Sequence, residues 1–211
     1  MVSPGRRGVL LRAGRALVIA THHPPFTGSP FHVPSPEMLK MIDDACEEVG
    51  IWPDLHISGH AHLYERYTRT VKGKQIPYLV AGMGGYYDLP GLKPGKRAPV
   101  PKFPAAGEDA SGNPLRIEMY NDDTFGFVRI TVSTAQISGV FVTVDPKTGK
   151  TGTGDSFTLD LKTNKVSGGG AAKVAPSKSA GTSSAGTTGG AAKKTPPKGT
   201  KGRKGTKSER R

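Results

Sequence analysis

Residues 16–25 read ALVIATHHPP and residues 54–62 read DLHISGHAH, and these two runs decide the fold of the chain. Each run begins with a short apolar segment and ends with two histidines. Short apolar segments bounded by Gly and Pro are typical of buried β-strands. We therefore predict one strand in each run, with the histidines placed directly after the carboxyl end of that strand.

An amphipathic helix is predicted between the two runs. Ser35 is a good N-cap, because its side-chain oxygen can accept a bond from an amide of the first turn, and Pro36 suits the first helical position. Gly50 ends the helix. The apolar residues that recur at helical spacing are Met38, Met41, Ile42, Ala45 and Val49. Strand, helix and strand make a βαβ unit, which predicts parallel strands with a right-handed crossover.

The βαβ topology predicts a site at one edge of the sheet. Parallel strands place their carboxyl ends on the same edge, where open α/β sheets have their binding sites. We therefore expect His22 and His60 to lie close together in space. His60 and His62 are two residues apart, so their rings would point to the same side of an extended segment. Neutral imidazoles that converge in this way are typical metal ligands.

The rest of the folded part reads as strands. We expect a hairpin over residues 68–80 that turns at residues 72–74, and then a long loop rich in Pro and Gly over residues 88–114. From Leu115 the apolar residues alternate, which predicts an antiparallel meander ending in a strand over residues 156–161. The predicted fold class is therefore mixed, α/β or α+β, with a βαβ unit followed by antiparallel strands.

The positive charge lies mainly at the end of the chain. Residues 167–211 contain eleven Lys or Arg and one Glu, so they carry +10 of the formal net charge of +13. We expect this Lys/Gly/Ala/Thr-rich tail to be disordered, because it has too few apolar residues to form a core. It could bind nucleic acid weakly and without specificity through counterion release, or it could be a solvated extension. We expect residues 1–15 to be basic and irregular, and residues 16–166 to form the domain.

Cysteine content and hydropathy exclude some classes of protein. The single cysteine, Cys46, cannot form an intrachain disulfide, and we expect it to be a small buried residue of the helix. No apolar run reaches the length of a transmembrane span, and the first residues do not read as a signal peptide. The chain as written would be cytoplasmic, and it would be exported if an upstream half carried a signal.

Residues 59–66 read GHAHLYER. This run resembles the Gly-His-x-His-x-Tyr-Glu-Arg signature of purple acid phosphatases, within the calcineurin-like metallophosphoesterase superfamily. The upstream strand that ends in His-x-Pro at His22, and the strand and turn over residues 78–85, resemble the same family. The resemblance covers about residues 15–166. It implies a partial metallophosphoesterase β-sandwich with flanking helices, which corresponds to the C-terminal half of the catalytic domain.

The resemblance also implies a chemistry and a set of roles. Members of this family hydrolyse phosphate esters by a metal-bound hydroxide at a dinuclear centre of iron, zinc or manganese. The resemblance implies that His22 and His60 bind one metal and that His62 binds the other. His32 matches a histidine that contacts phosphate or donates a proton. His23 occupies a position that is not a metal ligand in the family, so we expect it to shape the loop.

The chain departs from the family at its beginning. Three sequence blocks that supply a bridging aspartate, an asparagine ligand and a catalytic histidine are absent from residues 1–20. Two neighbouring cations repel unless a bridging anion screens them, so imidazoles alone predict one metal rather than two. A separate chain could supply the missing half in trans. The alternative function is a non-enzymatic remnant that binds polyanions or nucleic acid through the basic tail.

The remaining polar residues of these motifs have structural explanations. His56 lies inside the apolar strand, so we expect it to be structural. For Tyr64, Glu65 and Arg66 we expect a packed tyrosine and an ion pair rather than a role in catalysis. Asp54 is expected to be a turn residue between helix and strand, and the alternative is a hydrogen-bond partner for a ligand histidine.

Overall fold

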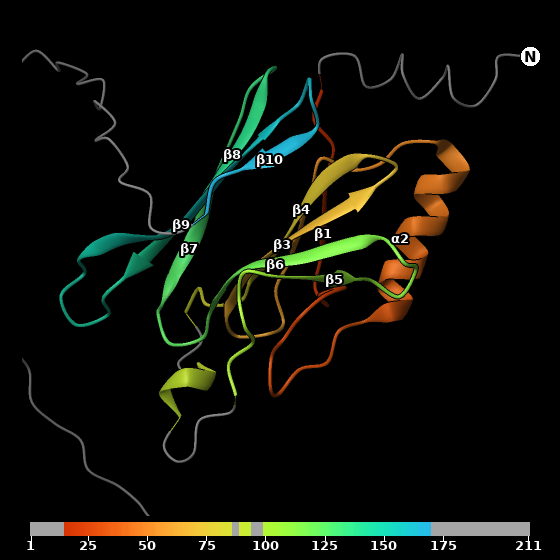
Figure 1. Cartoon of the computed structure of the whole chain (residues 1–211). Coiled ribbons are helices and arrows are strands. Elements are labelled where there is room, and N and C mark those ends of the chain that lie inside the picture. The colour runs from red at the N-terminus through yellow and green to blue at the C-terminus, as the bar shows by residue number, and fades with distance from the viewer. Residues whose placement is uncertain (1–14, 86–88, 94–98, 170–211) are drawn as a thin grey trace, which may run out of the picture. The chain divides into compact units, whose positions relative to one another are not determined.

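A computed structural model of the chain describes residues 15–85, 89–93 and 99–169 (Figure 1). Strands dominate this part, and they form two β-sheets accompanied by one α-helix. The six-stranded sheet has the order β1-β2-β4-β3-β6-β5, and the four-stranded sheet has the order β10-β9-β8-β7. The predicted mixture of α and β structure is therefore confirmed, with strands in the majority.

The bounds of the elements are as follows. The six-stranded sheet contains β1 (Val18–Thr21), β2 (Leu55–Ser58), β3 (Tyr64–Val71), β4 (Lys74–Ala81), β5 (Ala105–Glu108) and β6 (Pro114–Asn121). The four-stranded sheet contains β7 (Gly126–Val132), β8 (Gln136–Val144), β9 (Thr151–Asp160) and β10 (Lys165–Ser167). The helices are α2 (Pro36–Val49) and the short 3-10 helix η1 (Pro90–Leu92).

The predicted βαβ unit is confirmed. Strands β1 and β2 pair in parallel, and α2 lies between them in sequence. The Ser35 side chain caps the helix by accepting a bond from the Met38 amide at 3.3 Å. Gly50 ends it in the left-handed conformation, with φ of 68°, which glycine adopts without steric cost.

The buried face of α2 differs from the predicted one. The buried residues are Leu39, Ile42 and Cys46, whereas Met41 and Val49 are 67% and 49% exposed. Leu39, Ile42 and Cys46 recur at three and four residues, so they share one face of the helix. That face packs against the cluster that contains Trp52 and Tyr78. The expectation for Cys46 is confirmed, because its thiol is free and buried.

The predicted hairpin is confirmed and is longer than expected. Strands β3 and β4 are antiparallel and turn at Lys72 and Gly73, which both have positive φ. Strand β4 also pairs in parallel with β2, so it links the hairpin to the βαβ unit. The predicted loop over residues 88–114 is wrong in part, since it includes η1 and β5. Strand β5 reads AAGE, which has no strand pattern, and it forms through pairing with β6.

The predicted meander is confirmed for β7 to β9, which pair as sequential antiparallel neighbours, and the structure adds β10, which was not predicted and pairs with β9. Strand β6, which contains Leu115, does not belong to it, because β6 pairs with β3 in the other sheet. The alternating pattern correctly indicated a strand but carries no information about its partner. Strand β9 starts at Thr151 rather than at the predicted residue 156. Its first half is polar and rich in glycine, so the apolar pattern did not indicate it.

A core cluster joins the two sheets. It combines two leucines of the six-stranded sheet with residues of β8 and β9, and its buried members are Leu55, Leu79, Ile137, Phe157 and Leu159. Beside it, Arg66 on β3 forms an ion pair with Asp155 on β9, with a nitrogen–oxygen distance of 2.6 Å and both side chains fully buried. The Tyr64 hydroxyl donates to the same carboxylate at 2.8 Å. The expected packed tyrosine is therefore confirmed. Arg66 does form an ion pair, but its partner is Asp155, 89 residues away, and Glu65 instead accepts hydrogen bonds from Gly28 and Tyr67.

The predicted ends of the chain lie almost entirely outside the described residues. The irregular basic segment was placed at residues 1–15, and only Arg15 of it is described. The tail was placed at residues 167–211, and Ser167 is in fact the last residue of β10. In the described part of the chain, no helix is both long enough and apolar enough to cross a membrane, which agrees with the prediction.

Asp155→Ala should lower the free energy of unfolding by about 3–5 kcal/mol, because it leaves the buried guanidinium of Arg66 without its partner. The matched control is Asp44→Ala, which removes the exposed i, i+4 pair with Lys40 and should cost less than about 1 kcal/mol. Urea denaturation measures both values. Equal effects of the two substitutions would show that the buried pair does not stabilise the contact between the sheets.

Candidate metal centre

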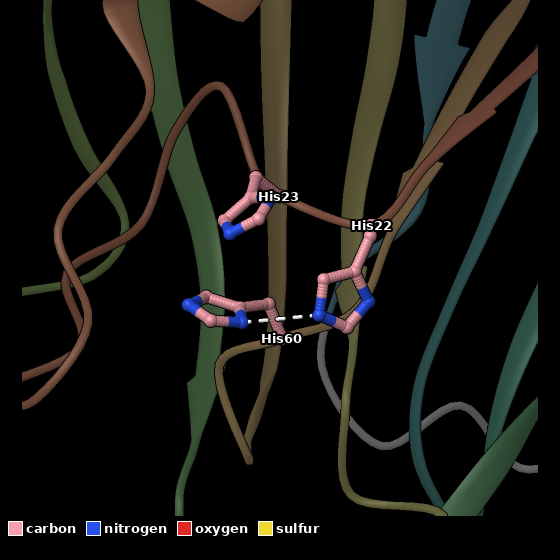
Figure 2. A group of neighbouring side chains, drawn as sticks. All are labelled: His22, His23 and His60. Carbon is pink, nitrogen blue, oxygen red and sulfur yellow. Dashed lines mark hydrogen bonds between the residues drawn. The ribbon is translucent and has the colours of Figure 1, made fainter.

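The two histidine runs leave the six-stranded sheet at the same edge. Strands β1 and β2 are parallel and in register, with Thr21 opposite Ser58. The Gly59 amide then donates to the carbonyl of His22 at 3.1 Å, which continues the pairing beyond both strand ends. His22 and His60 are therefore held side by side, with His60 Nδ1 only 3.1 Å from His22 Nε2 (Figure 2). The predicted proximity of these two residues is confirmed.

Three imidazoles gather at this edge. His22, His23 and His60 each offer a ring nitrogen, and the three nitrogens lie within 4.8 Å of one another. Figure 2 shows the rings of His23 and His22 close to that of His60. His22 and His23 are exposed and His60 is half-buried, so the group opens to solvent. We call these three residues the histidine triad.

His62 lies outside the histidine triad. The prediction that His60 and His62 occupy an extended segment is wrong, because residues 60–63 form bends and His60 has a left-handed φ of 62°. Two backbone hydrogen bonds hold this segment in a tight turn. The Ala61 amide donates to the Gly59 carbonyl, and the Leu63 amide donates to the Ala61 carbonyl. The ring of His62 is instead 5.2 Å from that of His32.

His32 connects the histidine triad to His62. Its ring centroid lies 4.7 Å from that of His60, so five histidines form a continuous chain of ring contacts. Partial burial, and then the nearby His62 and Lys93, lower the pKa of His32. The pKa of His60 is also lowered, by burial first and then by its four histidine neighbours. Burial and neighbouring charges thus favour the neutral forms of His32 and His60, which is the protonation state of a metal ligand.

The donor set of the histidine triad fits a cation. Two imidazole nitrogens bound to one tetrahedral zinc ion, at Zn–N distances of about 2.0–2.1 Å, lie ~3.3 Å apart. The His22–His60 separation of 3.1 Å is close to this value. In the absence of a cation, the same distance suits a hydrogen bond from a ring N–H to a ring nitrogen. Among the described residues, the group that could hold a cation consists of histidines alone and contains no carboxylate.

Buried polar groups hold the loops of the site. The Thr21 hydroxyl donates to the carbonyl of His23 at 2.9 Å and lies 3.3 Å from His56 Nε2. His56 is fully buried and stacks on Tyr78, and burial lowers its pKa to about 4. The structural role expected for His56 is therefore confirmed. Asp54 lies at the opposite end of β2, where it accepts bonds from the Leu17 amide and from Lys74, as expected of a residue in that turn.

Gly82 allows the turn that carries His60 and His62 to pack against the end of β4. Its amide donates to the Leu63 carbonyl at 3.0 Å. A Cβ atom at this position would lie 1.9 Å from the Ala61 carbonyl oxygen, which is far inside contact distance. This close approach of two backbone segments requires glycine at position 82.

Glu65, for which a structural role was expected, makes contacts in the site region that the sequence did not indicate. It is fully buried, and its Oε1 accepts bonds from the Gly28 amide at 2.7 Å and the Tyr67 hydroxyl at 3.0 Å. Gly28 belongs to the loop that runs from His23 to His32, so Glu65 ties that loop to β3. Burial raises the pKa of Glu65 to about 7, although these hydrogen bonds oppose the shift. No periodicity in the sequence could have indicated this contact.

The chain was compared with known proteins. No protein-family model matches it, and no curated protein sequence does so significantly. Among solved structures, one match is "GAP50 the anchor in the inner membrane complex of Plasmodium", with 13% sequence identity and a TM-score of 0.42. The match covers 80% of this chain and 42% of that chain, so this chain spans less than half the length of that protein. This likeness is too weak to carry an argument about fold or function.

Gly82→Ala should displace the turn over residues 59–63, because the new methyl group overlaps the Ala61 carbonyl. We expect a loss of about 2 kcal/mol or more in unfolding free energy, together with weaker metal binding. Gly107→Ala is the matched control, since a Cβ at Gly107 meets no atom within 4 Å. Thermal melts measure the stability of both variants, and a zinc titration measures their metal affinity. Normal zinc affinity in Gly82→Ala would contradict the proposed role of this contact.

Glu65→Gln should remove a pH dependence of stability. The folded pKa of about 7 exceeds the usual value of 4.5, so the stability that the protonated carboxyl contributes is present below pH 4.5 and is lost as pH rises through 7. The unfolding free energy of Glu65→Gln minus that of the wild type should therefore increase by roughly 3 kcal/mol between pH 4.5 and pH 8. Urea denaturation across this range tests it. A difference that does not change with pH would show that Glu65 has an ordinary pKa.

Proposed function

We propose that the chain is a metal-dependent hydrolase of phosphate esters and that its reaction takes place at the histidine triad. One observation carries the proposal: imidazole nitrogens from two loops, 38 residues apart in sequence, meet within the distance that a shared cation requires. The resemblance of residues 59–66 to the purple acid phosphatase signature supports a phosphate ester as the substrate class. Zinc, iron and manganese are the candidate metals from the resemblance, and imidazole ligands favour zinc and iron over manganese.

His22 and His60 would hold the cation in this proposal. When bound, such a cation acts as a Lewis acid on phosphoryl oxygens and lowers the pKa of water. The protein would contribute position and charge. His22 is exposed, so a substrate can approach the centre from solvent. The backbone bond from Gly59 to His22 keeps the two loops at a fixed separation, which pre-organises the ligands.

His32 and Lys93 would bind the phosphoryl group. The His32 ring lies 4.7 Å from that of His60, on the loop that begins with His22 and His23. Lys93 approaches the same loop, with its ammonium 4.3 Å from the centre of the Phe31 ring, and its charge acts on His32. A neutral His32 can accept or donate one hydrogen bond, and its protonated form can give a proton to a leaving oxygen. His32 and Lys93 therefore form a polar, cationic group beside the histidine triad, which we call the phosphate-binding group.

A partner chain is a further part of the proposal. In the described residues β1 is an edge strand, because it pairs with β2 alone. The His22 ligand follows this strand directly, so a strand added to β1 would end beside the histidine triad. A separate chain that supplies carboxylate ligands in trans, as the absent family blocks require, would therefore be expected to pair with β1.

His60→Ala should reduce metal-dependent hydrolysis of an aryl phosphate by at least about 100-fold, because it removes a ligand at the centre of the group. The assay uses the full chain with added manganese, zinc or iron, and follows release of the phenol. The matched control is Lys40→Ala, an exposed change on α2, which should retain activity. Turnover that survives both His60→Ala and a chelator would refute the proposed function.

A further inference from the structure

The histidine triad differs from the ligand set that the sequence resemblance implies. The resemblance gives a ligand role to His62 and none to His23. In the structure, His23 supplies the third nitrogen of the compact group. Its ring centroid is 4.3 Å from that of His60 and 5.0 Å from that of His22. The two sets share His22 and His60, so the choice between His23 and His62 distinguishes them.

The backbone around His23 is fixed from both sides. The Thr21 hydroxyl donates to the His23 carbonyl, and Pro24 and Pro25 follow, both buried. The Pro24 carbonyl accepts a bond from the Ser35 amide at 2.9 Å, which ties the loop to the start of α2. Proline restricts the backbone further. His23 is therefore held beside His60 by main-chain contacts, while its own side chain stays exposed.

The backbone at His60 directs its ring toward the other two residues. Its φ of 62° lies in the left-handed region, which is uncommon for residues other than glycine. Such conformations are retained where surrounding contacts require them. The two backbone bonds over residues 59–63 provide those contacts, and they place the His62 ring beside His32 instead of in the triad.

Charge limits the number of cations. Three neutral imidazoles leave the full charge of a divalent ion uncompensated, and the triad contains no carboxylate to bridge a second ion. Three protein ligands with a fourth position open to solvent is the usual form of a catalytic zinc site. The exposed rings of His22 and His23 leave that fourth position accessible.

We propose that the chain binds one divalent cation through His22, His23 and His60, with His23 in place of His62 as the third ligand. This mononuclear centre rests on the proposed metal-dependent function, yet its ligand set can fail while that function stands. In this arrangement His62 joins His32 in the phosphate-binding group rather than binding the metal.

Cobalt(II) titration of the full chain tests the ligand set without reference to turnover. The wild type should bind one cobalt ion per chain, with the intense visible absorption of a four-coordinate site. His23→Ala should weaken cobalt affinity by at least about 100-fold, since loss of a ligand exceeds the 10- to 100-fold cost of losing a supporting contact. His62→Ala, the matched control, should change the affinity by less than about threefold. Circular dichroism of each variant verifies that it is folded.

Three results would overturn the ligand set. Cobalt binding lost in His62→Ala and kept in His23→Ala would restore the set implied by the resemblance. Two cobalt ions per wild-type chain would exclude a mononuclear centre. In both cases aryl phosphate turnover that still depends on His60 would leave the proposed function intact. A folded wild type that binds no cobalt, zinc or manganese would refute both proposals.

Discussion

The parallel pairing of β1 with β2 is the constraint on which the rest of the site depends. It is only four residues long in each strand, and the Gly59–His22 backbone bond extends it by one step. This extension brings two histidine loops together at the sheet edge. Parallel strands require a crossover connection, and α2 supplies it with a well-defined cap at each end. A slip of one residue would break the Gly59–His22 hydrogen bond and turn the side chains of β1 to the other face of the sheet.

A second set of contacts holds the strands that support this edge. The buried pair of Arg66 with Asp155 joins β3 to the four-stranded sheet, and the Tyr64 hydroxyl bonds to the same carboxylate. A buried charge pair of this kind contributes orientation as well as energy, because each oxygen requires a particular donor. Gly82 then brings β4 within contact of the turn that carries His60. The position of the histidines thus depends on packing far from the site.

The chemistry of the site follows from the crowding of five imidazoles. Burial, and then the charges of neighbouring groups, lower the pKa values of His32 and His60 and favour their neutral forms. Neutral rings can share a proton in hydrogen bonds or share a cation. The 3.1 Å separation of His22 and His60 permits both arrangements. A cation therefore competes with a single internal hydrogen bond, and little reorganisation of the loops is needed to bind it.

The local features of this protein follow from its amino-acid sequence alone. Apolar segments, the Ser35 and Gly50 caps and the histidine runs were enough to predict the βαβ unit and the meeting of His22 with His60, because these depend on short-range periodicity and on one topological rule. The partner of Arg66, the pairing of β5 and the presence of His23 rather than His62 in the triad could be seen only in the three-dimensional structure. Those outcomes depend on contacts between distant residues and on the left-handed backbone at His60, and neither leaves a periodic signal in the sequence.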